Sequence, residues 1–245
     1  MNAIVKLDSV YQHIQGRCVL ENINLSIQHG EAFALLGPNG SGKTRLLRLI
    51  MGLDRASAGS IEVLGHDIAR LSFAKMQALR ASLGMVFQGG SLLHDLSVVE
   101  NLILPLQQSR HSAAALQRAA RLIMTQLRLD GLENLRPYEL SGGLMRKVEL
   151  ARALIRRPAL LLWDELLDEL DPASLCELRE HLRQENQTRE MTLLFTSHQV
   201  TNAISIAHRI GVLANGRMLF TGTEKDLQQA KQHNLEIRYV VDGQP

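Results

Sequence analysis

A glycine-rich loop is the stretch of this sequence whose residue types and spacing point most directly to chemistry. It follows the apolar run AFALL and precedes the periodic segment RLLRLI, the strand, loop and helix context of a phosphate-binding loop. Glycines let backbone N–H groups curl around phosphate oxygens at a helix N-terminus. Within the loop, Lys43 is expected to reach the β- and γ-phosphates of a nucleotide, and Thr44 to bind Mg²⁺. The nucleotide-binding residues predicted here are Gly37, Pro38, Asn39, Gly40, Ser41, Gly42, Lys43 and Thr44.

Two carboxylates end a buried apolar run. Leu160 to Glu165 read LLLWDE, so Asp164 and Glu165 lie at the carboxyl end of a predicted strand, where ligands bind in open α/β sheets. Asp164 is expected to contact Mg²⁺ through water, and Glu165 to polarise a water molecule as general base. An acidic loop after a core strand explains the dipeptide alone equally well. The phosphate-binding loop in the same chain favours the catalytic interpretation.

A second glycine pair, in LSGGL, is predicted to begin a helix. Ser141 is a favourable N-cap, and Gly142 and Gly143 leave the first backbone donors of the helix exposed. This arrangement predicts an anion site that has no lysine of its own. The helix would place apolar side chains on one face, and we expect its basic side chains to be mostly solvated. These basic residues are Arg146, Lys147, Arg152 and Arg156.

The elements that would position these residues alternate between strand and helix signals. Apolar runs separated by turn residues predict a largely β-structured first part. From about residue 89 to 157 the pattern is helical, with Ser97 and Glu100 spaced as a capping box and Pro158 ending the last helix. Strand signals then return, which indicates an α/β core interrupted by a helical insertion. Strands are predicted at 4–10, 19–27, 32–36, 60–64, 83–87, 159–164, 192–196 and 210–213.

The composition fits one globular unit and restricts the class of partner. With 245 residues, 45% of them hydrophobic, the chain can bury a full core. Its 27 basic and 25 acidic residues give a net charge of +2, so nothing indicates a nucleic-acid partner. Cys18 and Cys176 lie far apart, and we expect both to be packing residues in a reduced compartment. We expect neither a secretory leader nor a membrane-spanning run.

In this order, the three motifs and the later His198 resemble the ATP-binding subunits of ABC transporters over nearly the whole chain. The resemblance implies a P-loop NTPase (RecA-like) α/β core with an antiparallel β subdomain and an inserted helical subdomain. We expect one domain over residues 1–245, with its core at 1–88 and 159–245 and the helical subdomain at about 89–158. The resemblance also implies ATP hydrolysis with Mg²⁺, a transmembrane permease partner and a head-to-tail homodimer. In such a dimer, Ser141, Gly142 and Gly143 of one copy close on the ATP that the other copy's loop holds.

Three further residues take roles only from this resemblance. Gln88 in MVFQGG matches the Q-loop, which senses the γ-phosphate and Mg²⁺, and His198 in FTSHQ matches the switch histidine at the γ-phosphate. Asp171 matches the D-loop aspartate. Without the resemblance, Gln88 would be a surface residue and His198 a structural one. The catalytic residues expected are therefore Lys43, Gln88, Glu165 and His198, and the Mg²⁺-binding residues expected are Thr44, Gln88 and Asp164.

Three less specific sequence segments resemble the ATPase of the Mla/Mce-type lipid transporters. They are FQGGSLLHDLSVVENLILPL from the Q-loop onward, the apolar Leu144 after LSGG, and GRCVLENINLSI near the start. This resemblance implies phospholipid transport, a small STAS-domain partner, an Mce-type periplasmic partner, and a place on the cytoplasmic side of the inner membrane. The ATPase of a small-solute ABC importer is the nearer alternative. A regulatory module that binds ATP without hydrolysing it is an alternative of another class, because Leu166 and Leu144 depart from the family pattern.

Two regions leave alternatives open. Tyr11 is the aromatic candidate for stacking on adenine, but it lies a few residues early for that role, and the alternative is a plain strand residue. After Gly222 the pattern predicts a polar helix and a short apolar segment at 235–241. We expect this tail to pack on its own chain, and contact with a second copy is the alternative.

Overall fold

Two β-sheets with helices around them make up the structure, a computed structural model that describes residues 3–107, 112–165, 180, 184 and 191–243. The larger sheet has the strand order β10-β9-β3-β8-β7-β6, in which β10 is antiparallel to β9 and the other described pairings are parallel. Its strands are β3 (Ala32–Leu36), β6 (Leu83–Val86), β7 (Leu160–Trp163), β8 (Thr192–Ser197), β9 (Arg209–Ala214) and β10 (Arg217–Gly222). The α/β class expected from the sequence is confirmed.

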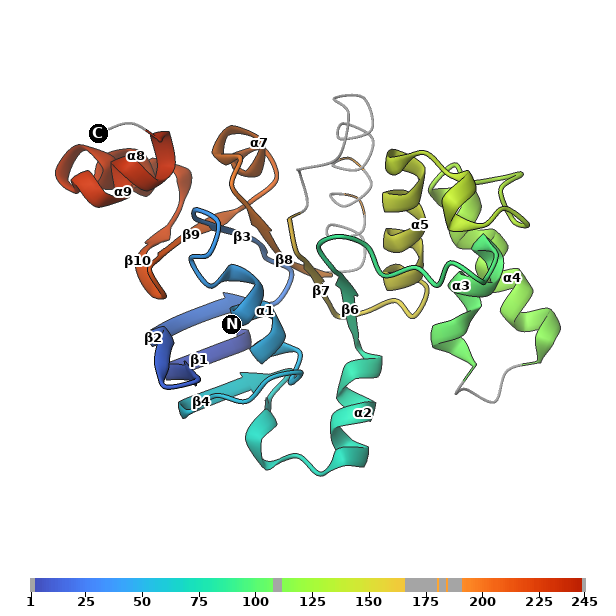
Figure 1. Cartoon of the computed structure of the whole chain (residues 1–245), viewed down its shortest axis with the longest axis horizontal. Helices are drawn as coiled ribbons and strands as arrows, with labels where there is room; N and C mark the ends of the chain where they lie inside the picture. The colour runs from blue at the N-terminus through green and yellow to red at the C-terminus, as the bar shows by residue number, and fades with distance from the viewer. Residues whose placement is uncertain (1–2, 108–111, 166–179, 181–183, 185–190, 244–245) are drawn as a thin grey trace.

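The smaller sheet is antiparallel and has the order β2-β1-β4-β5. It consists of β1 (Ala3–Ile14), β2 (Arg17–Gln28), β4 (Ala58–Val63) and β5 (His66–Asp67), so the expected antiparallel β subdomain is confirmed. Helix α1 (Lys43–Ile50) lies between the two sheets in Figure 1. Its leucines share one buried cluster with residues of both sheets.

Strand β3 connects the two halves of the core because successive side chains of a strand point to opposite faces. Phe33 and Leu35 pack in the cluster that contains α1. Ala32, Ala34 and Leu36 pack in the second cluster, which contains the helical elements. All five residues of β3 are buried, which explains why the sequence shows a continuous apolar run here instead of an alternating one. The phosphate-binding loop begins at the end of this fully buried strand.

The helical elements α3 (Val98–Ile103), α4 (Ala113–Gln126) and α5 (Gly142–Leu154) lie together beyond β6 and β7 (Figure 1). The capping box predicted at Ser97 and Glu100 is present in α3. Asn101 is fully buried, and its side-chain amide donates to the carbonyls of Leu93, Leu96 and Ser97. These bonds tie the loop before α3 to the helix.

Three of the described α-helices and β-strands were not predicted from the sequence, and the two-residue strand β5 is one of them. Helix α2 (Phe73–Ala81), capped by Ser72, lies in the part expected to be mostly β. Strand β10 pairs with β9 across a turn at Asn215 and Gly216, whose φ angles are 48° and 73°. Positive φ at two successive residues is the type I′ hairpin geometry that Asn-Gly favours. The Asn-Gly dipeptide was therefore the signal that could have predicted β10.

The C-terminal part forms two helices, α8 (Glu224–His233) and α9 (Leu235–Asp242). The apolar segment expected at 235–241 is thus helical, and Ile237 is buried in the same core cluster as β9 residues. Figure 1 shows both helices beside β9 and β10. The tail packs on its own chain, as expected.

Within the described residues, no helix combines the length and apolar character that a membrane span requires.

Candidate nucleotide-binding site

The phosphate-binding loop has a shape that only glycine permits at two positions. A Cβ atom on Gly37 would lie 2.0 Å from the carbonyl oxygen of Leu213, and one on Gly42 would lie 2.7 Å from Cδ2 of Leu20. Gly37 and Gly42 also have φ angles of 154° and 109°, which L-residues rarely adopt. The loop therefore keeps its backbone open as a concave surface at the N-terminus of α1, where anions bind favourably.

Lys43 is buried beneath this loop, with 5% of its surface exposed. Its Nζ donates to the carbonyl oxygens of Gly37 at 2.8 Å and Pro38 at 3.1 Å. A buried ammonium requires compensating partners, and these carbonyls supply them. The ammonium group of Lys43 has three N–H donors, so the buried side chain can also donate to an oxygen of a phosphate bound in the loop.

Glu165 occupies an unusual backbone conformation at the end of β7. Its φ is 56°, in the left-handed region that is uncommon for non-glycine residues, although seven other such residues of the described chain share it. The Glu165 N–H donates to Oγ1 of Thr196 at 2.7 Å, and this hydroxyl donates to Oδ1 of Asp164 at 2.7 Å. Thr196 and Asp164 are both buried. The threonine hydroxyl therefore fixes the two neighbouring carboxylates relative to each other.

Three of the predicted catalytic residues converge around the Glu165 carboxylate. Its Oε1 lies 4.0 Å from Nζ of Lys43, and its Oε2 lies 3.9 Å from Nδ1 of His198. The side chain of Glu165 is 12% exposed and that of His198 is 46% exposed. A carboxylate between two basic groups, close to solvent, can accept a proton from a water molecule.

A cavity of about 760 Å³ opens at Lys43 and Glu165, and His198 is not among the residues that line it. Its lining includes seven residues that the sequence predicted, namely Asn39, Gly40, Gly42, Lys43, Thr44, Gln88 and Glu165. It also includes five that sequence reasoning missed, namely Cys18, Val19, Arg45, Asn215 and Gly216. The prediction that Cys18 is a packing residue is wrong, because Cys18 is exposed at this cavity. Cys176 lies outside the described residues.

Contacts between loops explain why four of these five residues could not be predicted, whereas Arg45 directly follows the predicted Thr44. The Gly216 N–H donates to the carbonyl of Ser41 at 3.0 Å. A Cβ on Gly216 would lie 2.5 Å from the carbonyl oxygen of Val19. The β9–β10 turn and the start of β2 thus border the phosphate-binding loop only in the folded chain.

The residues present fit a phosphate group with Mg²⁺. The hydroxyl of Ser41 is buried and has no hydrogen-bond partner among the described residues, so an incoming phosphate oxygen would satisfy it. Thr44 is exposed in the cavity lining, with its hydroxyl available to a hard cation. Asp164 is 1% exposed and is not among the residues that line the cavity, so its expected contact with Mg²⁺ through water stays a prediction.

The LSGG residues lie in a different part of the chain. Ser141 caps α5, and its Oγ accepts from the Leu144 N–H at 3.4 Å. Ser141 and Gly142 are exposed, but none of Ser141, Gly142 and Gly143 is among the described residues that line the cavity. In Figure 1, α5 lies with α3 and α4 and is separated from α1 by β6 and β7. One chain therefore does not bring its LSGG motif to its own phosphate-binding loop.

Three other sequence expectations have different outcomes. The prediction of solvated basic residues on α5 is wrong for Arg146, which is 6% exposed and forms an ion pair with Glu149 at 2.8 Å.

Tyr11 is a half-buried residue of β1 opposite Ala58, and it is not among the described residues of the cavity. Asp171 and Leu166 lie outside the described residues.

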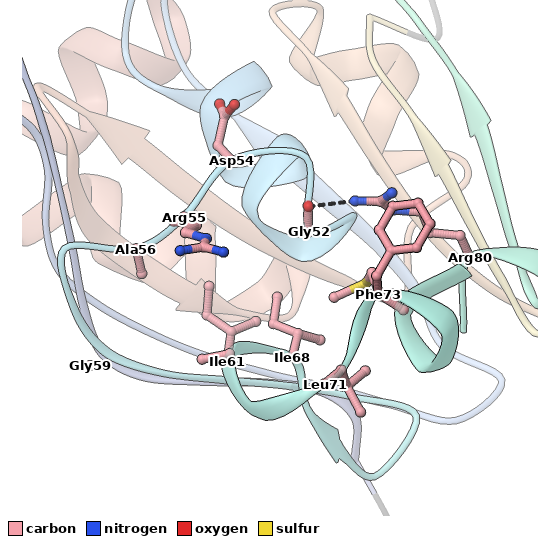
Figure 2. Close-up of a pocket in the computed structure, with 12 residues that line it drawn as sticks. Gly52, Asp54, Arg55, Ala56, Gly59, Ile61, Ile68, Leu71, Phe73 and Arg80 are labelled. Carbon is pink, nitrogen blue, oxygen red and sulfur yellow. Dashed lines mark hydrogen bonds between the residues drawn. The ribbon is translucent and has the colours of Figure 1, made fainter. Parts of the chain in front are cut away.

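A second cavity, of about 480 Å³, lies between β4, the turn Ile68–Arg70 and α2 (Figure 2). Arg80 crosses one side of it and donates to the carbonyl of Gly52 at 2.6 Å. None of the predicted nucleotide-binding or catalytic residues lines this cavity. The nucleotide chemistry therefore belongs to the cavity around Lys43.

Comparison with known proteins agrees with this geometry. The family model described as ABC transporter matches residues 20–168. The intermembrane phospholipid transport system ATP-binding protein MlaF of Haemophilus influenzae is 34% identical over 231 residues, which cover 93% of this chain and 86% of that protein. The sulfate/thiosulfate import ATP-binding protein CysA 2 of Chromobacterium violaceum is 39% identical, with 91% of this chain and 60% of that protein covered. The methionine import ATP-binding protein MetN 1 of Rhodopseudomonas palustris is 34% identical, with 90% and 59% covered.

A solved structure extends the likeness to the fold. The dimeric structure of a post-hydrolysis state of the ATP-binding cassette MJ0796, bound to ADP and Pi, superposes with a TM-score of 0.83. It is 28% identical, and the match covers 89% of this chain and 98% of that one. Cassettes of this kind bind ATP with Mg²⁺, and ATPase dimers with transmembrane permease partners are general for them. The chain belongs to the ATP-binding cassette family of ABC transporter ATPases.

Proposed function

We propose that the chain binds ATP at the cavity around Lys43, hydrolyses it to ADP and phosphate, and thereby drives a transporter. The observation that carries the proposal is the convergence of Lys43, Glu165 and His198, with separations of 4.0 and 3.9 Å around one carboxylate. Gln88 lines the same cavity. A regulatory module that only held ATP would have no need of a carboxylate poised beside the phosphate loop.

In this proposal the residues act by positioning and charge. Phosphoryl transfer passes through a loose transition state with negative charge on the equatorial oxygens. The loop amides and Lys43 stabilise that charge, and Glu165 takes the proton of the attacking water. Mg²⁺, held by Thr44 directly and by Asp164 through water, would neutralise charge on the β- and γ-phosphates. We expect His198, beside Glu165, and Gln88, in the cavity lining, to contact the γ-phosphate, and no covalent intermediate is required.

A second copy of the chain completes the site in this proposal. The LSGG motif has an exposed helix N-terminus at Ser141 but lies away from the cavity of its own chain. In a head-to-tail pair, Ser141, Gly142 and Gly143 of one copy would cover the ATP bound by the other. The solved structure of the MJ0796 cassette is dimeric, which supports this arrangement.

The transported substrate is proposed to be a phospholipid, by analogy with MlaF. The match covers 86% of MlaF, against 60% of CysA 2 and 59% of MetN 1, so the chain corresponds to a cassette of the shorter type. The apolar segment after Gln88 also supports a permease contact, since Leu93 is 47% exposed while Leu92 is buried. The proposed partners are a transmembrane permease, a small STAS-domain protein and an Mce-type periplasmic protein. The proposed location is the cytoplasmic side of the inner membrane.

The ATPase of a small-solute importer remains the second candidate, because the CysA 2 and MetN 1 proteins are as similar in sequence as MlaF. Purification of the tagged chain from native membranes in mild detergent, followed by mass spectrometry, distinguishes the two. Recovery of a permease with an Mce-type protein supports lipid transport. Recovery of a permease with a solute-binding protein supports import, and recovery of the chain alone contradicts both.

The catalytic part is tested by phosphate release from the purified chain. Glu165→Gln removes the general base and keeps the shape of the side chain, so we expect turnover to fall by about 10²-fold or more. Binding of ATP should be retained, because Lys43 keeps its two carbonyl partners. Normal turnover in this variant would remove Glu165 from the role of base.

A further inference from the structure

The second cavity, between β4, the turn Ile68–Arg70 and α2, has the size of a small-molecule site. Its volume of about 480 Å³ lies within the range of roughly 300–1,000 Å³ that is typical of ligand pockets. Among the described residues, none lines both this cavity and the nucleotide cavity around Lys43. A ligand bound here would therefore not occupy the nucleotide site.

Most of the wall of this cavity is apolar. Ile61 is buried, and the half-buried Ile68, Leu71 and Met76 pack against the core cluster that contains α1 while they also line the cavity. Phe73 adds an aromatic ring to the lining, although 78% of this residue is exposed (Figure 2). Apolar and aromatic walls with a few placed polar groups are typical of small-molecule sites.

Local structure explains why Phe73 can face a ligand. Ser72 caps α2, and its Oγ accepts from the Lys75 N–H at 3.4 Å, so Phe73 is the first residue of the helix. Leu79 is the buried residue of this helix, which means that the core does not use the aromatic ring. Phe73 and Met76 are three positions apart and are neighbours on one face of α2. Folding therefore leaves the first turn of α2 available to the cavity.

A half-buried guanidinium on the same helix supplies one positive charge. Nε of Arg80 donates to the carbonyl of Met51 at 3.1 Å, and Nη2 donates to the carbonyl of Gly52 at 2.6 Å. These two bonds fix the plane of the guanidinium and use two of its five N–H donors. Within the part of the chain that the structure describes, Nη1 makes no hydrogen bond or ion pair. This nitrogen can therefore donate to an anion in the cavity.

A second arginine lines the cavity opposite Arg80. Arg55 is exposed, and it makes no hydrogen bond or ion pair with any residue that the structure describes. In Figure 2 its guanidinium lies on the other side of the cavity from that of Arg80. Asp54 also lines the cavity, but its two carboxylate oxygens accept from Arg48 at 2.8 and 2.9 Å. The negative charge of Asp54 is thus already compensated, and the lining keeps an excess of positive charge.

We propose that this cavity binds a single-chain amphipathic anion. Its carboxylate or phosphate lies at Arg80 and Arg55, because guanidinium groups bind such oxyanions through charge-assisted and often bidentate hydrogen bonds. Its chain lies against Ile61, Ile68 and Phe73, where burial removes apolar surface from water. The two interactions together select a molecule that has both parts, against a neutral alcohol or a short carboxylate.

Calorimetric titration of the full chain without nucleotide tests the class of ligand. The probes are octanoate and octyl phosphate, which distinguish a carboxylate from a phosphate. The controls are octan-1-ol, which lacks the charge, and acetate, which lacks the chain. We expect saturable binding of at least one of the two octyl anions, and binding of octan-1-ol that is weaker by about tenfold or more, because the charge-assisted hydrogen bonds are lost. If neither anion binds more tightly than octan-1-ol, the inference is overturned.

A double variant tests whether the anion binds at this cavity. Arg55→Gln with Phe73→Ala removes one charge and the aromatic ring at two exposed positions, so this variant should fold. We expect its affinity for the octyl anion to fall by about tenfold or more. Arg70→Gln is the matched control, because Arg70 is an exposed residue of the neighbouring turn that pairs with Asp67 and does not line the cavity.

Wild-type affinity for the anion in the double variant would overturn the assignment of the site. The affinity of this variant for ATP should match that of the wild type, since neither substituted residue lines the nucleotide cavity. The titration with octyl anions uses no nucleotide. A chain that failed to hydrolyse ATP would therefore contradict the proposed function and leave the result of this test unchanged.

Discussion

Thr196→Val is the substitution whose consequences the structure defines most closely. The Thr196 hydroxyl accepts from the Glu165 N–H and donates to Oδ1 of Asp164, each at 2.7 Å, and no part of Thr196 is exposed. Valine keeps the volume but leaves a buried donor and a buried carboxylate oxygen without this partner. One neutral and one charge-assisted hydrogen bond of this type together contribute about 2–4 kcal/mol. For a domain of this size, the expected fall in melting temperature is about 5–15 °C.

The same substitution should reduce catalysis more than nucleotide binding. Glu165 needs its N–H bond to hold a φ of 56°, so without the hydroxyl the carboxylate is no longer fixed between Lys43 and His198. We expect turnover to fall by about 10- to 100-fold. Thermal unfolding, phosphate release and nucleotide affinity are measured together, with Thr196→Ser as the control that keeps the hydroxyl. A valine variant with wild-type turnover and less than about 0.5 kcal/mol of destabilisation would refute this reasoning.

Two further substitutions test separate features. Gly37→Ala places a Cβ 2.0 Å from the Leu213 carbonyl, so we expect ATP binding to be lost in calorimetry. The control Gly65→Ala meets no atom within 4 Å and should cost only about 1–2 kcal/mol of backbone strain. The Arg48 guanidinium, through its hydrogen bonds, lowers the pKa of Asp54. That stabilisation is present above the unfolded pKa and lost as pH falls through the folded value. Because this pair is partly exposed, Asp54→Asn should cost only about 0.5 kcal/mol at pH 7, and in urea unfolding the difference from wild type should shrink as pH falls below the unfolded pKa of Asp54.

Local sequence patterns predicted most of the sheet that positions the site. Strand β3 has the predicted bounds of 32 and 36, because a fully buried parallel strand reads as an uninterrupted apolar run. Helix α2 was missed because only Leu79 on it is buried, so the apolar periodicity that identifies helices is weak.

The loops and motifs that depend on local chemistry were also predictable. The capping role of Ser141 and the presence of a glycine-rich turn before α1 follow from neighbouring residues alone, but the close approach of Leu213 to Gly37 and of Leu20 to Gly42 does not. The solvated state predicted for Arg146 was wrong for a tertiary reason. Its helical spacing from Glu149 was visible in the sequence, but the carbonyl of Phe87 that it also binds was not.

The central claim is that two copies of the chain enclose ATP between them, and the most direct test is the mass of the Glu165→Gln variant in solution. Sedimentation velocity with and without MgATP measures it. We expect a monomer without nucleotide and a dimer with MgATP, because in the proposed pair Ser141 of each copy would cover its partner's cavity and does not line its own. A variant that binds MgATP and remains monomeric at all protein concentrations would contradict the account.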